Sequence, residues 1–203
     1  EERLSKEFES VGFFISGHPL NQFKEIFDDY KIISFSDFNL NKDINDSNVA
    51  ATLLKIQEKK TQKGNSYAII KCTDLSTVFE LFIFSDTLEL NRELLVEGNS
   101  LLITLNKSLN DEMNRFRRIN VKKIASMKNL LNSPINQVKF DLKNVNNLEE
   151  LSKKLINKDG NSDIEIELID LDKKLIFKLK NKRQIGRKSI NLIKNNDISA
   201  IIN

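Results

Sequence analysis

The sequence predicts a mixed α/β protein of more than one domain, with a helical hairpin, a small β-barrel and a small α+β domain. Three observations predict this class. Apolar residues recur at helical spacing near the start, a series of short β-branched strands follows, and a strand–helix–strand–strand pattern begins after residue 128. With 203 residues, 39% of them hydrophobic, the chain is long enough for one or two small cores.

Residues 1–45 predict a helical hairpin and a linker that end the preceding region of a longer protein. Gly17 suits the end of the first helix, and Pro19 suits the first turn of the second. The Asn-, Asp- and Ser-rich stretch 34–47 predicts the linker, with Phe35 and Phe38 packed on a neighbouring surface. The apolar residues at helical spacing are Leu4, Phe8, Val11 and Ile15, then Phe23, Ile26 and Phe27.

Residues 46–128 predict a five-stranded OB-fold, a partly open barrel. Three strands, a helix and two strands follow one another within about 80 residues, which is the order of elements in that fold. We expect Ser85 or Asp86 to cap the helix, Gly98 to follow it, and Phe82 and Phe84 to lie in the core. The predicted strands span 49–56, 67–72, 78–84, 101–107 and 116–124, and the helix spans 86–96.

Residues 129–203 predict a small α+β domain. The residues Asp159, Gly160 and Asn161 are expected to stop its helix, and Leu171, Asp172 and Lys173 to form a hairpin tip. Alternation places Ile164, Ile166 and Leu168 on one face of a strand. The predicted strands span 138–142, 164–169 and 174–179, the helices span 145–156 and 189–193, and an apolar tail spans 198–202.

The composition favours a binding module over a self-contained enzyme. A single cysteine, Cys72, excludes a disulfide framework and a multi-cysteine zinc site, and a single histidine, His18, leaves little material for a catalytic triad. We expect His18 to cap a turn, Cys72 to be a buried strand residue, and paired carboxylates such as Asp28 and Asp29 to be solvated. No apolar run is long enough for a membrane helix, so we expect a cytoplasmic protein.

The first candidate binding site is the loop between the first two barrel strands. OB barrels bind single-stranded nucleic acid by combining basic groups that follow the phosphates with aromatic rings that stack on bases. The alternative is a solvated hairpin tip in a Lys-rich protein. The candidate residues are Lys55, Lys59, Lys60, Thr61, Lys63, Gly64 and Tyr67.

A second candidate is the arginine-rich stretch around Phe116. Arginine binds phosphate in a bidentate manner and stacks on bases, so Arg115, Arg117 and Arg118 suggest nucleic-acid contact. Alternation places Arg115 and Arg117 on one face and Phe116 and Arg118 on the other. At most one of these pairs should face a ligand, and the other arginines would solubilise an edge strand.

The segment Gly12-Phe13-Phe14-Ile15-Ser16-Gly17-His18-Pro19-Leu20, followed by Lys60-Thr61-Gln62-Lys63-Gly64, resembles the C-terminal part of the bacterial DNA polymerase III alpha subunit. The resemblance implies a role in DNA replication, with template contacts at Lys60, Thr61 and Lys63. It implies that the whole protein is a DNA-directed DNA polymerase, a nucleotidyltransferase, with Mg²⁺ in a palm domain that has no counterpart here. We therefore expect no cofactor and no catalytic residue in this chain.

The expected partners follow from the same resemblance. They are single-stranded DNA at the barrel, the clamp-loader tau subunit at the last domain, and other replisome subunits through the missing part. Two other functions remain open: an anticodon-binding module of a tRNA synthetase, and a protein-interaction module that uses the apolar tail at Ile198, Ile201 and Ile202. A stand-alone hydrolase would lack the necessary chemistry.

Overall fold

The computed structural model describes residues 17–108, 118–170 and 173–202. The chain forms two compact units: the first ends at Asn132 and the second begins at Ser133. The expected border after residue 128 falls within α4 (Met127–Asn132), the last helix of the first unit. Each unit has its own sheet and its own apolar core.

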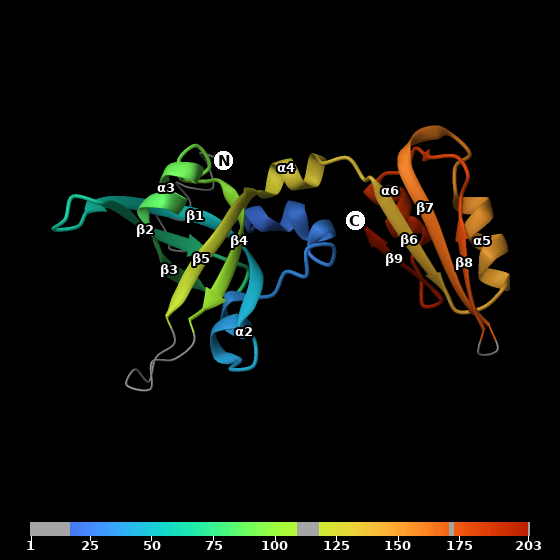
Figure 1. Cartoon of the computed structure of the whole chain (residues 1–203), viewed down its shortest axis with the longest axis horizontal. Coiled ribbons are helices and arrows are strands. Elements are labelled where there is room, and N and C mark those ends of the chain that lie inside the picture. The colour runs from blue at the N-terminus through green and yellow to red at the C-terminus, as the bar shows by residue number, and fades with distance from the viewer. Residues whose placement is uncertain (1–16, 109–117, 171–172, 203) are drawn as a thin grey trace. The chain divides into compact units, whose positions relative to one another are not determined.

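The first unit is a five-stranded antiparallel barrel. Its strands lie in the order β3-β2-β1-β4-β5, and β3 approaches β5, so the sheet curls back on itself (Figure 1). Helix α3 (Ser85–Asn91) connects β3 to β4. This arrangement is that of an OB-fold, which confirms the predicted barrel. The strands are β1 (Asp46–Lys60), β2 (Ser66–Thr73), β3 (Val78–Ile83), β4 (Ser100–Lys107) and β5 (Ile119–Ser126).

Side-chain alternation along β3 decides which of its aromatic residues fill the barrel. Phe79 is buried together with the other inward residues of the strand, whereas Phe82 is 49% exposed and Phe84, just after the strand, is 46% exposed. The prediction that Phe82 and Phe84 lie in the core is therefore wrong. Successive side chains of a strand point to opposite faces, so both residues share the solvent side with Glu80.

The opening of the described chain is a 3-10 helix, η1 (Pro19–Ile26). His18 caps it as expected, because its Nδ1 accepts a hydrogen bond from the backbone N–H of Leu20 at 3.1 Å. Gly17 has a φ of +108°, in the region that favours glycine. The first predicted helix lies outside the described residues.

The expected linker contains a helix, α2 (Phe35–Leu40). Ser34 caps it by accepting from the N–H of Asp37 at 2.9 Å, and the Ser34 hydroxyl donates to the Asp37 carboxylate at 2.7 Å. Phe38 is fully buried in the barrel core, and the Phe35 ring stacks on that of Phe79 with centroids 3.9 Å apart. The packing predicted for both rings is confirmed, but the absence of secondary structure is not.

Helix α3 is shorter than predicted and begins one residue earlier. Its N-cap is Phe84, which makes no side-chain capping hydrogen bond, so the prediction of a Ser85 or Asp86 cap is wrong. Leu88 from this helix is buried in the barrel core. The chain leaves the helix well before Gly98, whose φ of +91° marks the turn into β4.

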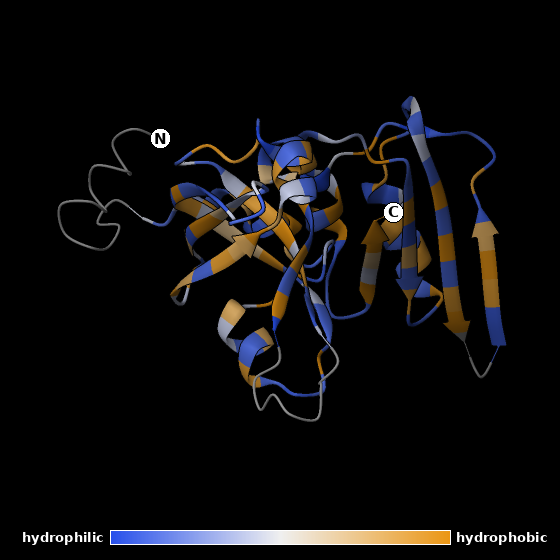
Figure 2. Ribbon diagram, turned by 60° about the vertical axis from the view of Figure 1, so that its left-hand side comes forward, coloured by the Kyte–Doolittle hydropathy of each residue, from blue (hydrophilic) through white to orange (hydrophobic). Residues whose placement is uncertain are grey.

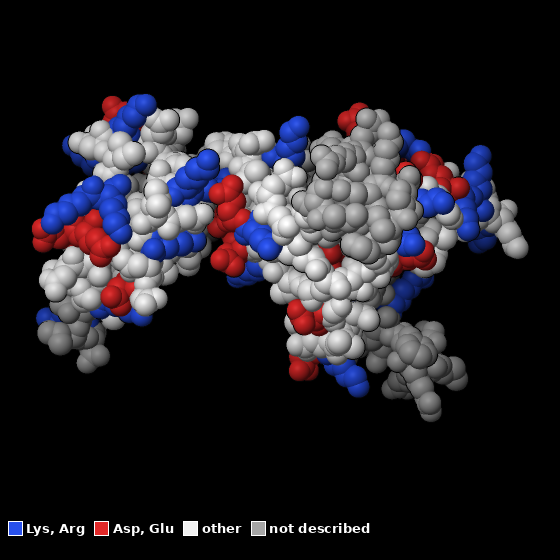
Figure 3. Space-filling model, turned by 180° about the vertical axis from the view of Figure 1, so that it is seen from behind, with Lys and Arg blue, Asp and Glu red and all other residues white. Residues whose placement is uncertain are grey.

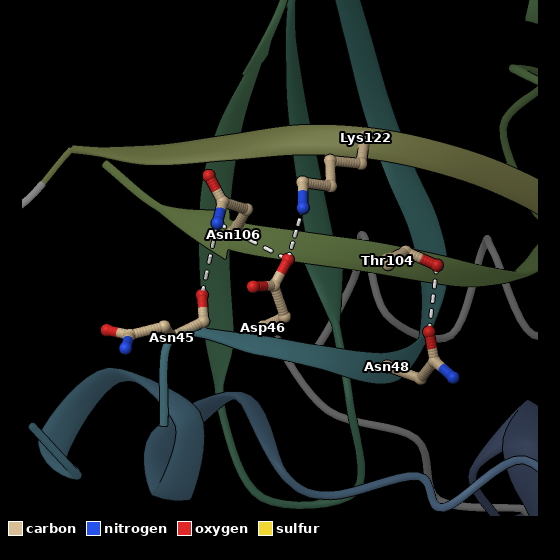
Figure 4. Close-up of polar contacts among 6 residues, drawn as sticks. All are labelled: Asn45, Asp46, Asn48, Thr104, Asn106 and Lys122. Carbon is tan, nitrogen blue, oxygen red and sulfur yellow. Dashed lines mark hydrogen bonds and ion pairs between the residues drawn. The ribbon is translucent and has the colours of Figure 1, made fainter. Parts of the chain in front are cut away.

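A polar cluster ties the start of β1 to β4 and β5 (Figure 4). Thr104 donates from Oγ1 to Oδ1 of Asn48 at 2.8 Å, and Asn106 donates from Nδ2 to Oδ1 of Asp46 at 3.3 Å. The register between β4 and β5 shifts at Lys122, which is not aligned with a residue of β4. Its ammonium forms an ion pair with Asp46 and lowers the pKa of that carboxyl. Since these groups bind one another across three strands, we interpret the cluster as structural.

The second unit is a four-stranded sheet in the order β8-β7-β6-β9. Strands β6 and β7 are parallel and the other pairs are antiparallel. Buried residues of α5 and α6 share one core with alternate residues of the sheet, among them Ile164, Ile166 and Leu168 as predicted. The elements are β6 (Gln137–Leu142), α5 (Asn146–Lys154), β7 (Asp159–Asp170), β8 (Lys173–Lys178), α6 (Arg187–Ile193) and β9 (Ile198–Ile202).

Two expectations for the second unit are wrong. The residues Asp159, Gly160 and Asn161 begin β7 and do not stop α5, and Gly160 lies so close to the backbone of Gln184 that a Cβ atom there would be 2.3 Å from the Gln184 nitrogen. The apolar tail is the strand β9, in which Ile198 is fully buried and, of its three isoleucines, only Ile201 is well exposed. The tail is therefore core, because alternate residues face the helices. Leu171 and Asp172 of the predicted hairpin tip are outside the described residues.

Candidate nucleic-acid interface

The solvent side of β1, β2 and β3 forms one continuous surface, which we call the outer β1–β3 face. Residues on neighbouring strands are aligned across it: Lys59 pairs with Tyr67, and Ile69 pairs with Phe82. An irregularity in β1 between Leu53 and Lys55 sets this register. The face consists of Lys55, Gln57 and Lys59 from β1, Tyr67, Ile69 and Lys71 from β2, and Glu80 and Phe82 from β3.

Aromatic rings are open to solvent on this face. Phe82 is about half exposed and lies directly across from Ile69, and Tyr67 is partly exposed. Phe84 continues the row beyond the end of β3, and the guanidinium carbon of Arg118 lies 4.7 Å from the centre of its ring. These rings can stack on planar groups such as nucleic-acid bases.

The charge of the outer β1–β3 face is mainly positive. Lys55, Lys59 and Lys71 are exposed on it, Arg118 lies beside it, and Glu80 is its acidic residue. Lys71 and Glu80 are aligned partners on neighbouring strands. A surface with several cations around open rings can bind an anionic, aromatic chain.

The β1–β2 hairpin projects beyond the barrel, and basic side chains gather at its end (Figures 1 and 3). β1 continues to Lys60, so Lys59 and Lys60 belong to the strand and not to the loop, and they point to opposite sides. The turn is closed by a hydrogen bond from the N–H of Gly64 to the carbonyl of Thr61 at 2.9 Å. Gly64 has a φ of +84°, which explains the glycine at this tight turn.

The predicted site residues separate into three groups. Lys55, Lys59 and Tyr67 are brought together on the outer β1–β3 face. Lys60 points away from it, and Lys63 and Gly64 lie at the exposed tip, where the Thr61 hydroxyl accepts from the N–H of Asn65 at 3.1 Å and so has a role in the turn itself. The residues of the second candidate stretch, Arg115, Phe116 and Arg117, lie outside the described residues.

The sequence analysis missed four residues of this surface or assigned them elsewhere. Lys71 was not identified as a candidate, Phe82 and Phe84 were expected in the core, and Arg118 was assigned to the arginine-rich candidate stretch, within the predicted strand 116–124. The alternation around Glu80 was the available signal, since a charged residue in the middle of β3 marks the solvent side for its neighbours two positions away.

The single cysteine and the single histidine, which could in principle act as catalytic groups, have structural roles. Cys72 is buried, and burial raises the pKa of its thiol to about 12, which makes it unreactive. Burial also lowers the pKa of His18, whose Nδ1 caps η1. Within residues 17–108, 118–170 and 173–202, no three His, Cys, Asp or Glu side chains come together as a metal site would require. No helix in these ranges has the length and hydrophobicity to cross a membrane.

The chain is similar to several curated proteins with one name, although no family model matches it. It is 28% identical over 159 residues to the DNA polymerase III subunit alpha of Rickettsia felis, 30% over 147 residues to that of Rickettsia bellii, and 26% over 189 residues to that of Borreliella burgdorferi. These matches cover 77%, 71% and 88% of this chain. The chain spans only 13%, 12% and 16% of the respective relatives.

Among solved structures, a replication protein A heterotrimer bound to single-stranded DNA matches with a TM-score of 0.36 and 14% identity, over 71% of this chain and 36% of the other. The OB-fold assignment rests on the strand order and not on this distant likeness. The resemblance predicted from the sequence is confirmed by the curated relatives: over most of its length, this chain is similar to one segment of the bacterial DNA polymerase III alpha subunit.

Proposed function

We propose that this chain is a part of a replicative DNA polymerase and that its OB barrel holds unpaired template DNA on the outer β1–β3 face. The observation that carries the proposal is the placement of exposed rings, above all Phe82, among exposed lysines on one face of the barrel. Sequence similarity to DNA polymerase III alpha subunits supports the replicative context. In this proposal the protein acts in the cytoplasm and the chain contributes binding and no nucleotidyl transfer.

The proposed binding mode follows from the chemistry of the face. Bases would stack on Phe82 and Phe84, while Lys55, Lys59 and Lys71 neutralise phosphates along the strand. Rings and lysines contact every base and every phosphate alike, so the affinity should not depend on sequence. A duplex hides its base faces in its own stack, so single strands should bind more tightly.

The test is a titration of the chain with fluorescent oligo-dT of about 15 nucleotides, since one OB-fold covers about 4–16 nucleotides. Anisotropy is measured at several salt concentrations, with duplex DNA and folded tRNA as competitors. Three or four phosphate contacts predict a slope of log K against log salt of about −2 to −3. A preference for tRNA would favour the anticodon-binding alternative, and no binding to any of the three would favour a protein-interaction module.

For the second unit, we propose the docking of the clamp-loader tau subunit that the sequence resemblance implies. Its sheet and helices form a separate core, which suits an independent docking module. Other replisome subunits would bind elsewhere on the whole protein. The test is co-sedimentation of the chain with purified tau subunit, and a failure there would leave the DNA-binding proposal untouched because the two units are distinct.

A further inference from the structure

The last part of the second unit carries basic residues without acidic ones. Residues 173–196 contain nine Lys and Arg and no Asp or Glu, whereas the whole chain has 32 of the former and 29 of the latter. The range comprises β8, the connection to α6, α6 itself and the residues that follow it. Figure 2 shows the connection from β8 to α6 as hydrophilic along most of its length. The lysine content of the chain does not explain the missing acidic residues.

Three of these lysines neutralise the acidic residues of the neighbouring strand. They lie along β8 and just after it, and each forms an ion pair with a carboxylate on the face of β7 opposite to the core. The pairs are Lys174 with Glu167 at 2.7 Å, Lys178 with Glu165 at 3.2 Å and Lys182 with Asp163 at 3.0 Å. Because these carboxylates are already matched, they do not account for the other cations after β8.

The other cations gather at one end of the unit, which we call the basic end. The connection after β8 runs along the start of β7, where the N–H of Leu179 donates to the carbonyl of Ile164 at 3.0 Å. Further on, the N–H of Gln184 donates to the carbonyl of Lys158 at 2.8 Å. Helix α6 begins shortly after Gln184, so its first turn lies at the same end. The basic end consists of Lys158, Lys180, Arg183, Arg187 and Lys188.

Positive charge predominates at the basic end. Lys158, Lys180 and Lys188 are exposed, and in the described part of the chain none of them forms an ion pair. Arg183 is half-buried, and the described residues give it no ion pair either. Asp159, which follows Lys158, is the acidic residue that this end contains. Several cations are therefore available to an anion from outside the chain.

Lys188 stands where a cation destabilises its own helix. It lies in the first turn of α6, which contains no acidic residue, and the N-cap Gly186 makes no side-chain hydrogen bond. The partial positive charge at the beginning of a helix disfavours cations there. Arg187, in the same turn, is compensated by a hydrogen bond from its Nη1 to the carbonyl of Ser133 at 3.3 Å, whereas the described residues give Lys188 no such contact. A sequence is expected to work against its own fold where function requires it.

The chemistry of the basic end suits the backbone of a nucleic-acid duplex. Residues 155–163 and 178–196 contain no Phe, Tyr or Trp, so this end has no ring on which an unpaired base could stack. A duplex keeps its bases stacked inside and displays about one charge per 1.7 Å along its axis. An extended acidic peptide carries at most one charge per about 3.3 Å. The duplex is therefore the polyanion that gains more from a group of unmatched cations.

We propose that the basic end of the second unit binds the phosphate backbone of duplex DNA without regard to base sequence. The choice of DNA rests on the replicative function proposed above, but the site is separate from the outer β1–β3 face and needs no unpaired base. Phosphate contacts from four cations predict a slope of log K against log salt of about −3 to −4.

The probe is a fluorescent DNA hairpin with a stem of about 20 base pairs, titrated against the whole chain by anisotropy over a salt series. The basic-end variant, Lys158→Gln/Lys180→Gln/Lys188→Gln, should bind it at least tenfold more weakly at about 100 mM salt and reduce the slope by about 2 to 3. The control, Lys24→Gln/Lys31→Gln/Lys123→Gln, removes the same charge from exposed lysines of the first unit and should leave duplex binding unchanged. Equal losses in the two variants, or no duplex binding at about 50 mM salt, would overturn the proposal.

A second set of measurements separates this site from the barrel. Phe82→Ala should leave duplex binding unchanged, and the basic-end variant should leave oligo-dT binding largely unchanged, so either proposal can fail alone. Duplex DNA should protect Lys158, Lys180 and Lys188 from acetylation by acetic anhydride and leave Lys24 and Lys31 reactive. Circular dichroism checks that both triple variants keep the fold. Unprotected lysines at the basic end, or tighter binding of a fluorescent deca-glutamate peptide than of the duplex, would overturn the proposal, the latter in favour of an acidic protein.

Discussion

The guanidinium carbon of Arg118 lies 4.7 Å from the centre of the Phe84 ring, at the end of the row that contains Phe82. A cation over an aromatic ring is attracted by the electron density of the ring face. The guanidinium of Arg118 thus already occupies a face of the Phe84 ring on which a base would stack. Among the described residues, no cation lies over the ring of Phe82 in this way. Phe82 is therefore the ring most directly available to an incoming base.

We predict that Phe82→Ala weakens binding of oligo-dT by about 5- to 150-fold, the equivalent of about 1–3 kcal/mol for the loss of one stacked base. The folded barrel should tolerate the change because half of the side chain is already in water. Anisotropy titration at constant salt measures the affinity, and circular dichroism measures the stability.

The matched control for Phe82 is Leu90→Ala, which removes an even more exposed apolar side chain from α3, outside the outer β1–β3 face. It should leave the affinity unchanged. If both variants bind oligo-dT as the unmodified chain does, the DNA does not stack on this face.

Two neighbouring lysines of the hairpin provide a second prediction. Lys59 is on the outer β1–β3 face opposite Tyr67, and Lys60 is on the other side of the same strand. Lys59→Ala should reduce the salt slope of oligo-dT binding by about one phosphate contact, and Lys60→Ala should have little effect. The pair is measured in one salt series. A larger effect from Lys60 would place the strand on the opposite side of the hairpin.

Lys107 provides a prediction on stability. Its ammonium is buried where α2 ends, donates to the carbonyl oxygens of Phe38 and of Asn41, the latter at 2.6 Å, and lies 4.6 Å from the centre of the Phe38 ring. Lys107→Met leaves these carbonyls without that donor and should lower the free energy of unfolding by about 2–3 kcal/mol.

Lys122→Met is the control for Lys107, because it breaks an exposed ion pair with Asp46 and should therefore cost clearly less stability than Lys107→Met. Urea unfolding monitored by circular dichroism measures both variants. Equal costs would mean that the buried lysine does not stabilise the end of α2.

The strands of this protein were predictable because apolar and polar residues alternate regularly along them. The helices were less predictable from the sequence. The five barrel strands follow from short β-branched runs, whereas their order in the sheet depends on pairings between segments that are distant in the sequence. α2 was missed because its composition is typical of a linker. Its signals are local: Ser34 and Asp37 form a reciprocal cap, and Phe35 and Phe38 stand three residues apart.

Only part of the candidate site could be predicted from the residue types and spacing within single strands. Lys55, Lys59 and Tyr67 were named as candidates together with Lys60, and the division between the two sides of β1 was not predicted, although strand parity carries that signal. Phe82 required a comparison between burial and exposure within β3, and a phenylalanine in a small barrel favours the core by composition. The approach of Arg118 to Phe84 joins segments far apart in the sequence and could not be predicted from local patterns.

Two glycines of the second unit give opposite predictions. A Cβ atom on Gly160 would lie 2.3 Å from the Gln184 nitrogen, whereas one on Gly186 would meet nothing within 4 Å. Gly160→Ala must therefore push apart backbone that is joined by the hydrogen bond from Gln184 N–H to the Lys158 carbonyl, at a cost of about 1–3 kcal/mol.

Gly186→Ala should change the stability by less than about 1 kcal/mol, because lower entropy of the unfolded chain offsets a poorer cap for α6. Thermal unfolding of the two variants makes the comparison. A neutral Gly160→Ala would show that the strand β7 and the segment at Gln184 separate without cost.

Cys72 gives a prediction on pH. Burial disfavours the thiolate and raises the pKa of the thiol from its ordinary value of 9.0 to about 12 in the folded barrel. Above pH 9 the thiol ionises in the unfolded chain but stays protonated in the folded one, so the stability should fall as the pH rises from 9 towards 12. Cys72→Ala is the control, since it removes this group and leaves every other titratable group in place.

Labelling of Cys72 by iodoacetamide at pH 8 tests the same burial directly. The thiolate is the reactive form, so the folded chain should react only when the barrel opens. The labelled fraction should then rise with urea along the same transition as circular dichroism, since β2, which carries Cys72, is paired on both sides, with β1 and with β3. Rapid labelling without urea would mean that β2 separates from its neighbours in the native state, and the outer β1–β3 face could not then be a rigid platform for DNA.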